Sequence, residues 1–546
     1  MYHPVPLENR EWPSKEITHA PIWCSVDLRD GNQALYSPMT IDEKLEFFAF
    51  LVKIGFKEIE VGFPAASATE FDFVRRLIEE DRIPDDVTIQ VLTQAREHII
   101  KKTVESLQGV KHAIIHLYNS TSTLQRRVVF KKDRAEIKQL AIDGAKLIRD
   151  LVDPNFTREQ IRYEYSPESF TCTEPEFAAE ITNAVLDVFE PTADRKVIVN
   201  LPSTIEVATA NVYADQIEYM CKHLKNRENL IISVHAHNDR GTGVASSELA
   251  LLAGADRVEG TLFGNGERTG NTDLVTVALN MFAQGIDPQL DISNIDEAIG
   301  VFEKYNKLPI HPRHPYAGDM AYVAFSGSHQ DAIKKSFDLF AEHPDNKWAN
   351  PYLTIDPKDI GRKYEPILIN SQSGKGGVSY IMEAKYGYTL PKKMLVEFSD
   401  LINRLSDEKQ TVLTNHEIHV AFKDEYVNLS SPIKMKFYRT QHTEDDTTTI
   451  TATVEYNGSV VSINGEGNGP LDALSAALRE LLGKELDIAS YHEHALERKS
   501  ASKAAAYIAV SGTDDKLYWG SGVDANISTA SLYALISAVN RMLSEE

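Results

Sequence analysis

In the first half of the chain, eight short runs rich in β-branched and other apolar residues alternate with segments of helical periodicity. This alternation is typical of parallel strands joined by crossover helices. Eight such units in one domain predict an α/β fold of the closed (β/α)8 TIM-barrel type, with an open doubly wound sheet as the alternative. The predicted strands cover residues 22–28, 58–62, 88–92, 113–118, 162–166, 196–201, 230–235 and 257–262.

Polar residues cluster after the carboxyl ends of these runs. In a barrel of parallel strands this end forms a single rim, and active sites are built there. The shared position therefore favours the barrel over the open sheet. The residues at this predicted rim are Arg29, Asp30, His116, Ser166, Glu168, Thr204, His235, His237 and Asn271.

The strongest functional signal is His235-Ala-His237, at the end of the run 230–235. Residues two apart in a strand point to the same face, so both imidazoles are expected to project into one small volume. A histidine pair alone is equally compatible with a polar strand end, but Arg29 and Asp30 follow the first run at an equivalent position. Two histidines and one aspartate with open coordination sites predict a catalytic divalent metal rather than a structural one.

Composition excludes several classes of function. The chain has 546 residues, too many for one core, and predicts three or four domains. Its formal net charge of −23 argues against nucleic acid or an anionic membrane as partner, because like charges repel. Three widely spaced cysteines form no disulfide or zinc pattern, and the residue pattern predicts neither a signal peptide nor a membrane-spanning segment. We therefore expect a cytoplasmic protein.

The patterns predict three parts. Residues 1–320 are assigned to the barrel, residues 321–428 to helical linker subdomains, and residues 429–546 to a small α+β domain. This last domain contains two copies of a ββα unit, with Asn457-Gly458 as the hairpin turn of the first copy. The repeat predicts a domain with a pseudo-twofold axis.

Glycines precede the helix of each repeat, including Gly467 and Gly469 in the first copy and Gly520 and Gly522 in the second. Glycine ahead of a helix leaves backbone N–H groups free to bind a carboxylate, although a tight turn uses glycine as well. Repetition at both corners favours a ligand site of the size of an amino acid.

Three motifs together resemble the metal-dependent, acyl-CoA-condensing aldol enzymes that include the 2-isopropylmalate, homocitrate and citramalate synthases. These motifs are Leu28-Arg-Asp-Gly-Asn-Gln33, His235-Ala-His-Asn-Asp239 and Gly264-Asn-Gly-Glu-Arg-Thr-Gly-Asn271. Residues 326–331, 370–377 and 467–471 resemble the long-form 2-isopropylmalate synthases in particular. The resemblance extends over essentially the whole chain.

The resemblance implies an enzyme that joins acetyl-CoA to 3-methyl-2-oxobutanoate and hydrolyses the thioester, the first committed step of leucine biosynthesis. Asp30, His235 and His237 are implied to hold Mg²⁺, Zn²⁺ or Mn²⁺, with Asn271 in or beside the coordination shell and monovalent K⁺ as a candidate activator. Arg29 is implied to stabilise the alkoxide that develops at the substrate carbonyl. The implied substrate-binding residues are Arg29, Leu92, His116, Tyr118, Ser166 and Thr204.

The resemblance also implies a homodimer. Removing a proton from the acetyl methyl group requires a positioned base. The family's candidate is His329, with Tyr352 beside it, both contributed by the partner subunit, and Glu168 completes the catalytic set. The residue pattern around His329 does not by itself select it. Leucine is implied to inhibit the enzyme by binding near Gly467 and Gly469.

Three alternatives remain open. The same chemistry on pyruvate or 2-oxoglutarate would make a citramalate or homocitrate synthase, and one or two methylenes distinguish these substrates weakly. A retro-aldol lyase on the same barrel is disfavoured because nothing resembles the cysteine-bearing loop of such lyases. A leucine-sensing protein with a dead barrel would be expected to lack a metal ligand, whereas Asp30, His235, His237 and Asn271 are all present.

Overall fold

The chain folds into two compact units. The computed structural model describes residues 3–343, 348–362, 375–409, 412–442, 447–496, 502–511 and 516–545. One unit comprises Met1–Ala321 with Ile355–Lys363, and the other comprises Tyr322–Thr354 with Tyr364–Glu546.

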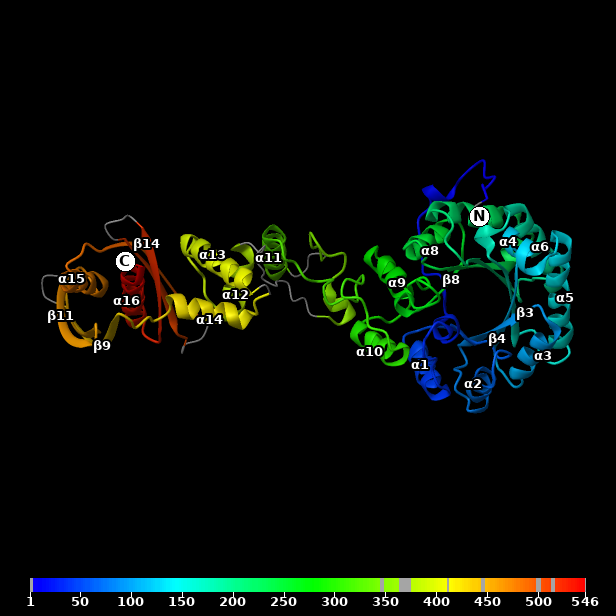
Figure 1. Ribbon diagram of the computed structural model, residues 1–546, viewed down its shortest axis with the longest axis horizontal. Coiled ribbons are helices and arrows are strands. Elements are labelled where there is room, and N and C mark those ends of the chain that lie inside the picture. Colours follow the sequence, from blue (N-terminus) through cyan, green and yellow to red (C-terminus); the bar gives the residue numbers. More distant parts are fainter. Residues whose placement is uncertain are drawn as a thin grey trace. The chain divides into compact units, whose positions relative to one another are not determined.

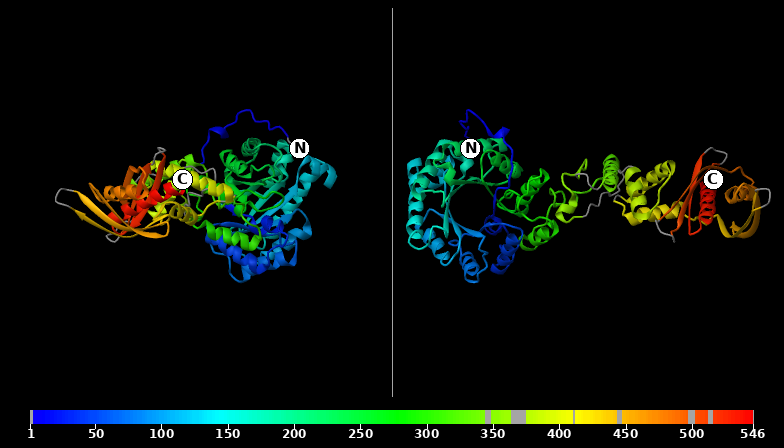
Figure 2. Two further views of the ribbon diagram at one scale, coloured as in Figure 1. Left: turned by 60° about the vertical axis from the view of Figure 1, so that its left-hand side comes forward. Right: turned by 180° about the vertical axis from the view of Figure 1, so that it is seen from behind.

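The first unit is a closed barrel of eight strands in chain order (Figures 1 and 2). All strand pairs are parallel, which confirms the predicted barrel and excludes the open sheet. The strands are β1 (Ile22–Ser25), β2 (Glu58–Gly62), β3 (Thr88–Gln94), β4 (Ala113–Ser120), β5 (Ile161–Glu168), β6 (Val197–Ser203), β7 (Leu230–Ala236) and β8 (Arg257–Gly260). The helices are α1 (Ile41–Lys53), α2 (Ala68–Glu79), α3 (Glu97–Ser106), α4 (Thr123–Gln125), α5 (Arg134–Val152), α6 (Pro175–Phe189), α7 (Ala210–His223), α8 (Gly243–Leu252), α9 (Leu274–Ala283) and α10 (Ile295–Asn306).

The barrel strands are apolar because both of their faces are buried. Every residue of β2, β6 and β7 is buried, as expected where helices cover the outside and side chains fill the inside. The interior nevertheless contains charged side chains at alternate positions, Glu58 and Glu60 on β2 and Arg257 and Glu259 on β8. These charges lie beneath the rim that carries the predicted site.

The first strand is shorter than predicted. β1 ends at Ser25, and Asp27–Gly31 forms a π-helical turn, η2. The N–H of Gly31 donates to the carbonyl of Val26 at 3.1 Å, which closes this turn. The predicted strand up to residue 28 was wrong because a buried turn and a buried strand have the same apolar pattern. Arg29 and Asp30 therefore lie on a turn and not on a strand end.

The eighth strand is shorter for a similar reason. β8 ends at Gly260, and η6 (Leu262–Gly264) follows as a 3-10 turn. The buried carboxylate of Asp27 accepts a hydrogen bond from the N–H of Leu262 at 3.1 Å, which ties the turns after β1 and β8 together. The two segments that carry the predicted metal ligands Asp30 and Asn271 are thus fixed to one another.

The linker contains the predicted helices. They are α11 (Gly327–Glu342), α12 (Lys375–Tyr386), α13 (Lys392–Lys409) and α14 (Asn415–Tyr426). The capping box of α14 pairs Thr414 with Glu417, as expected for a helix that starts after a polar turn. Of the predicted segment 370–377, residues 370–374 lie outside the described residues.

The C-terminal repeat is larger than predicted, because each copy has three strands instead of two. The first sheet has the order β11-β10-β9 and the second β12-β13-β14. The extra strands β9 and β12 are largely exposed. β9 begins with the apolar alternation Ile433-Lys-Met435-Lys-Phe437, a strand signal that the prediction did not include, whereas β12 has no regular alternation. The elements are β9 (Ile433–His442), β10 (Thr448–Tyr456), β11 (Ser459–Gly467), α15 (Pro470–Leu482), β12 (Asp487–Ala495), β13 (Ala504–Ser511), β14 (Leu517–Asp524) and α16 (Ile527–Glu545).

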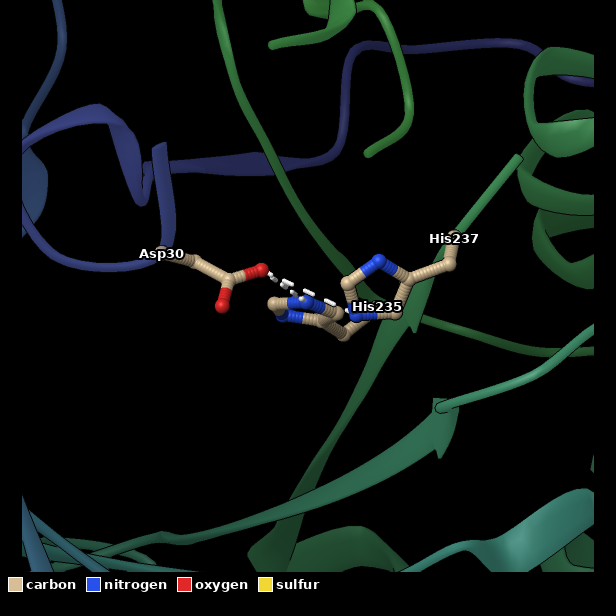
Figure 3. A group of neighbouring side chains, drawn as sticks. All are labelled: Asp30, His235 and His237. Atoms are coloured by element: carbon tan, nitrogen blue, oxygen red, sulfur yellow. Dashed lines mark ion pairs between the residues drawn. The ribbon is translucent and has the colours of Figure 1, made fainter. Parts of the chain in front are cut away.

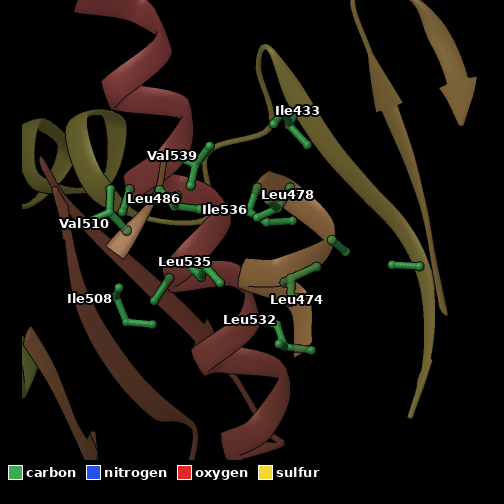
Figure 4. Packing of buried hydrophobic residues seen from close by; sticks show 14 of the residues in the cluster. Ile433, Leu474, Leu478, Leu486, Ile508, Val510, Leu532, Leu535, Ile536 and Val539 are labelled. Atoms are coloured by element: carbon green, nitrogen blue, oxygen red, sulfur yellow. The ribbon is translucent and has the colours of Figure 1, made fainter. Parts of the chain in front are cut away.

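One hydrophobic core joins the two copies of the repeat. α15 and α16 lie between the two sheets, and their buried side chains meet Ile433 of the first sheet and Ile508 of the second (Figure 4). The predicted hairpin is present, since Asn457 and Gly458 connect β10 to β11 with φ of 49° and 79°. The repeat therefore folds as one domain with a shared interior.

A second core lies on the outer face of β13 and β14. Tyr507 and Trp519 from these strands pack with Tyr388, Phe398 and Phe422 from the segment of α12–α14. A boundary between residues 428 and 429 would cut through this core. Truncation there would expose it, so point substitutions are the better way to probe the C-terminal domain.

Among the helices of the described ranges, none combines the length and the apolar character needed to cross a lipid bilayer.

Candidate active site at the barrel rim

The barrel brings Asp30, His235 and His237 together. His235 lies on β7, His237 directly follows it, and Asp30 projects from η2 toward both rings (Figure 3). The Oδ2 atom of Asp30 is 3.4 Å from Nε2 of His235 and 3.7 Å from Nε2 of His237. All three side chains are buried, and their candidate ligand atoms lie within 4.8 Å of one another. The sequence prediction that these three groups meet is confirmed.

Unpartnered atoms make this cluster suitable for a cation. Within the described residues, Oδ2 of Asp30 and Oδ1 of Asn271 are buried and accept no hydrogen bond. Asn271 forms a backbone bridge with His237, so its side chain starts beside the cluster. A buried oxygen without a partner is costly unless an ion or a donor satisfies it. Two imidazole nitrogens together with carboxylate or amide oxygens form a suitable ligand set for a divalent metal.

The charges of the cluster are tuned by neighbouring groups. Burial raises the pKa of Asp30, but Arg29 and His235 outweigh it and hold this pKa well below its usual range. Burial would lower the pKa of His235, yet the nearby carboxylates of Asp30 and Glu259, the second of them hydrogen-bonded to Nδ1, raise it to about 9. Burial and the nearby charge of His235 lower the pKa of His237 to about 4. Asp30 is therefore an anion and His237 a neutral imidazole at neutral pH.

Arg29 is held by two carboxylates. Its Nε donates to Glu60, and its Nη1 donates to Oδ1 of Asp30 at 2.8 Å. Gln33 also donates to Oδ1 of Asp30 at 3.1 Å, so Oδ2 is the oxygen that remains for the cluster. Burial alone would lower the pKa of Arg29, but the charges of Glu60 and Asp30 outweigh burial and raise this pKa above its usual value. The guanidinium therefore stays charged. A fixed positive charge therefore lies beside the histidines.

A cavity of about 380 Å³ opens above this cluster. It contains both polar groups and an apolar wall, the usual composition of a small-molecule site. The cavity is lined by Arg29, Asp30, Gln33, Phe63, Leu92, His116, Tyr118, Ser166, Glu168, Asn200, Pro202, Thr204, His235, His237, Glu267 and Arg268. The structure thus brings the barrel residues of the predicted site into one pocket, with Asn271 adjoining His237.

Two separate hydrogen-bond networks reach this pocket. His116 contacts Glu60 through Nδ1 at 2.9 Å and Ser166 through Nε2 at 2.7 Å. Glu168 instead accepts a hydrogen bond from Ser120. Burial raises the pKa of Glu168, so this group gains a proton more readily than an exposed glutamate. His116 and Glu168 therefore have different partners, although both line the cavity.

Thr204 lies on a loop at the edge of the pocket. Its Oγ1 accepts a hydrogen bond from the backbone N–H of Ser169 at 2.9 Å. A hydroxyl with an occupied acceptor can direct its own proton elsewhere. The loop that carries it is held by Arg268, which donates to the Thr204 carbonyl at 2.6 Å and pairs with Asp239. Thr204 lines the pocket, and its hydroxyl proton is available to a ligand there.

Sequence reasoning missed several pocket residues. Glu267 and Arg268 lie within the glycine-rich motif from which only Asn271 was selected, and Gln33 ends the first motif. The signal for Asn200 and Pro202 is their alternation at the end of β6, which places both inside the barrel. The additional pocket residue Phe63 directly follows β2.

His329 and Tyr352 belong to the second compact unit. Their rings stack with centroids 3.9 Å apart, and both side chains are exposed. The structure therefore places these two residues next to each other, as the resemblance implies. Their assignment to the active site of a partner subunit stays a prediction.

The glycines of the C-terminal domain have different surroundings. A Cβ on Gly467 would lie 2.7 Å from the backbone nitrogen of Ala473, and a Cβ on Gly522 would lie 1.9 Å from the carbonyl of Ala530. Close packing of strand on helix thus accounts for both glycines without a ligand. A Cβ on Gly469 would meet no atom of the described residues within 4 Å. Binding of leucine near Gly467 and Gly469 stays a prediction.

The chain matches known families over most of its length. Residues 20–301 match the HMGL-like family, residues 319–383 match the alpha-isopropylmalate synthase post-catalytic domain-like family, and residues 412–543 match the LeuA allosteric (dimerisation) domain. Fold and site thus define an HMGL-like barrel enzyme with an allosteric domain.

Curated relatives narrow this class. The 2-isopropylmalate synthase of Clostridium acetobutylicum is 54% identical over 99% of this chain and 98% of its own length. Those of Acetoanaerobium sticklandii and Rhodospirillum rubrum are each 53% identical over 99% of this chain, and over 96% and 98% of their own lengths. The chain belongs to the 2-isopropylmalate synthase family.

Proposed function

We propose that the protein condenses acetyl-CoA with 3-methyl-2-oxobutanoate and water to give (2S)-2-isopropylmalate and CoA, the first committed step of leucine biosynthesis. The observation that carries this proposal is the grouping of Arg29, Asp30, His235 and His237 at one pocket of about 380 Å³. A Mg²⁺, Zn²⁺ or Mn²⁺ ion held by the aspartate and the two histidines would supply a Lewis acid for the substrate carbonyl.

The fixed side chains orient the oxo acid. The Thr204 hydroxyl donates to the substrate carboxylate, since its oxygen already accepts from Ser169. Arg29, held by Glu60 and Asp30, stabilises the negative charge that develops on the carbonyl oxygen during carbon–carbon bond formation. These donors are in place before the substrate binds, so little reorganisation is needed.

The pocket wall suits a branched apolar group. Leu92, Tyr118, Phe63 and Pro202 line the cavity and supply apolar surface, while Ser166 contacts His116. The isopropyl group of 3-methyl-2-oxobutanoate buries more apolar surface against this wall than the methyl group of pyruvate does. A second carboxylate, as in 2-oxoglutarate, would lose water there without a matched partner.

The base is expected to come from a second subunit. A proton leaves the acetyl methyl group for His329 of the partner subunit, with Tyr352 of the partner subunit beside it. The methyl carbon bonds to the oxo carbon while the C=O π electrons move to oxygen, and this oxygen takes up a proton to become the hydroxyl of the product. Water then attacks the thioester, giving a carboxylate and CoA as its thiol. Glu168, whose pKa burial raises, can hold a proton during these steps. The match to a dimerisation domain supports this homodimer.

The three cysteines, Cys24, Cys172 and Cys221, are free thiols. Free thiols and a coenzyme that leaves as a thiol suit a reducing compartment, and we assign the reaction to the cytoplasm.

A substrate panel tests the proposed function. Thiol release from acetyl-CoA should require a divalent metal and should be fastest with 3-methyl-2-oxobutanoate, by at least about tenfold over pyruvate and 2-oxoglutarate in kcat/KM. The measurement is thiol release by the chelator-treated full chain with each metal and each oxo acid. Faster turnover of pyruvate or 2-oxoglutarate would replace the proposal by citramalate or homocitrate synthesis. Absence of thiol release with every oxo acid would favour a leucine-sensing protein.

Leucine inhibition has its own test at Gly469. We expect Gly469→Val to raise the leucine concentration for half-inhibition by about tenfold, because the new side chain fills open space at the start of α15 where leucine is proposed to bind. The leucine-free rate should not change. The measurement is the rate against leucine concentration, with Ser459→Val in the exposed strand β11 as control. Unaltered inhibition in the Gly469 variant would place leucine elsewhere.

A further inference from the structure

A buried carboxylate lies directly below the metal-ligand cluster. Glu259 on β8 is paired in register with His235 on β7, and its side chain has no exposed surface. Its Oε2 atom is 2.8 Å from Nδ1 of His235. This nitrogen is the one that faces away from Asp30, whose Oδ2 lies 3.4 Å from Nε2. Glu259 therefore contacts the imidazole on the side opposite the proposed cation.

Glu259 is held from several sides by donors. Its Oε1 accepts from Nη1 of Arg257 at 2.6 Å and from Nε2 of Gln90 at 3.1 Å. Its Oε2 accepts from Nδ2 of Asn200 at 3.3 Å besides contacting His235. A carboxylate surrounded by donors is an acceptor in every one of these bonds. The proton between Glu259 and His235 therefore belongs to Nδ1 of the histidine.

Arg257 makes this arrangement rigid. The guanidinium is fully buried, and its Nε donates to Oε2 of Glu58 at 2.6 Å. It also donates through Nη1 to Ser233 at 2.8 Å and through Nη2 to Gln90 at 2.7 Å. Because the arginine is fixed on three sides, the carboxylate of Glu259 cannot rotate without breaking several buried bonds.

The same carboxylate also belongs to a second cluster, with His116 and Glu164. This cluster has no free ligand set for a second metal. Both ring nitrogens of His116 have partners, Glu60 and Ser166, and both oxygens of Glu259 have donors. Within the described residues, only the oxygens of Glu164 in this trio lack a hydrogen bond. We therefore do not assign Glu259 to a second metal site and consider its contact with His235 instead.

We propose that Glu259 is a positioning residue that fixes the tautomer and ring plane of His235, so that Nε2 is presented to the metal. This inference rests on the proposed metal-dependent function. A histidine that ligates through one nitrogen commonly donates its other N–H to a carboxylate, and loss of that partner lowers metal affinity by about 10- to 100-fold. Glu259 would thus act on the reaction through His235 without touching the substrate.

Glu259→Gln tests this role with little change in shape. Arg257 continues to require an acceptor, so the amide oxygen should face Arg257 and the amide N–H₂ should face Nδ1 of His235. His235 would then carry its proton on Nε2, which cannot ligate in that form. We expect the affinity for Zn²⁺ to fall by about 10- to 100-fold, measured on the full chain by competition with a chromogenic chelator.

Glu58→Gln is the matched control. Glu58 also pairs with Arg257 inside the barrel, through the bond of 2.6 Å to Nε, but it does not contact His235 in the structure. The control should therefore lose a buried charge while keeping Zn²⁺ affinity near the wild-type value. Equal affinity losses in both variants would mean a general electrostatic effect and would overturn the proposal. Wild-type affinity in the Glu259 variant would overturn it as well.

A measurement on the wild-type chain covers the case in which Glu259→Gln does not fold. In the Zn²⁺-loaded protein with ¹⁵N-labelled histidine, long-range ¹H–¹⁵N spectra should show His235 protonated at Nδ1, assigned by comparison with His235→Gln. A proton on Nε2, or on neither nitrogen, would contradict the role of Glu259. Failure of the wild-type chain to bind Zn²⁺, Mg²⁺ or Mn²⁺ would instead contradict the proposed function itself.

Discussion

Asp30→Asn is expected to lower kcat/KM by about a thousandfold or more, equivalent to roughly 4 kcal/mol of transition-state stabilisation. Oδ1 of Asp30 accepts from Arg29 and Gln33, so the amide oxygen of the variant should take that position. The amide N–H₂ would then face His235 and His237 in place of the free oxygen Oδ2. A donor would replace the anionic ligand, so both metal affinity and rate should fall.

The measurements are kcat/KM at saturating metal and Zn²⁺ affinity by chelator competition. Asp42→Asn is the control, because it replaces a carboxylate by an amide at a position far more exposed than Asp30. The Asp42 side chain lies on α1, is 81% exposed and pairs with Arg76. The control should keep wild-type rate and affinity. A variant Asp30→Asn that binds Zn²⁺ as tightly as the wild type would remove Asp30 from the metal site.

Arg29→Lys is expected to lower kcat by about 100- to 1,000-fold, with a much smaller change in KM for the oxo acid. Arg29 reaches Glu60 through Nε and Asp30 through Nη1 at the same time. Lysine keeps the charge but has one nitrogen, and it cannot occupy both positions of the planar fork. The stabilised charge develops only as the new bond forms, so the loss should appear mainly in kcat.

Steady-state kinetics with 3-methyl-2-oxobutanoate as the varied substrate separate these effects. Arg162→Lys is the control, because it makes the same change in another arginine–glutamate pair of the barrel. Arg162 pairs with Glu58 at 2.6 Å and does not line the pocket. We expect this control to keep kcat near the wild-type value. A loss in the Arg29 variant that falls entirely on KM would mean that Arg29 binds the substrate without stabilising the transition state.

Much of the fold and the grouping of Asp30 with His235 and His237 could be predicted from sequence because local periodicity has direct geometric meaning. Strand alternation places His235 and His237 on one side of β7, and parallel strands collect their carboxyl ends at one rim. The position of Asp30 near the histidines follows from the same rule, even though it lies on a π-helical turn.

The sequence patterns did not predict the buried charge network. Glu60 and Glu259 lie on β2 and β8, and nothing in their local sequence indicates that the first fixes Arg29 and the second fixes His235. Such pairs depend on the closure of the barrel, which brings residues far apart in the chain within hydrogen-bond distance. The extra strands β9 and β12 are largely exposed strands at the sheet edges. β12 lacks an apolar alternation, whereas the alternation Ile433-Lys-Met435-Lys-Phe437 of β9 is a local signal that the prediction did not include.

By itself, the sequence determined the succession of strands and helices, the candidate ligands Asp30, His235 and His237, and the family to which the chain is similar. The tertiary structure decided which oxygen of Asp30 stays free and which nitrogen of His235 faces the cluster. The physical reason is that periodicity assigns a side chain to a face, whereas its protonation and direction depend on the groups that barrel closure packs around it.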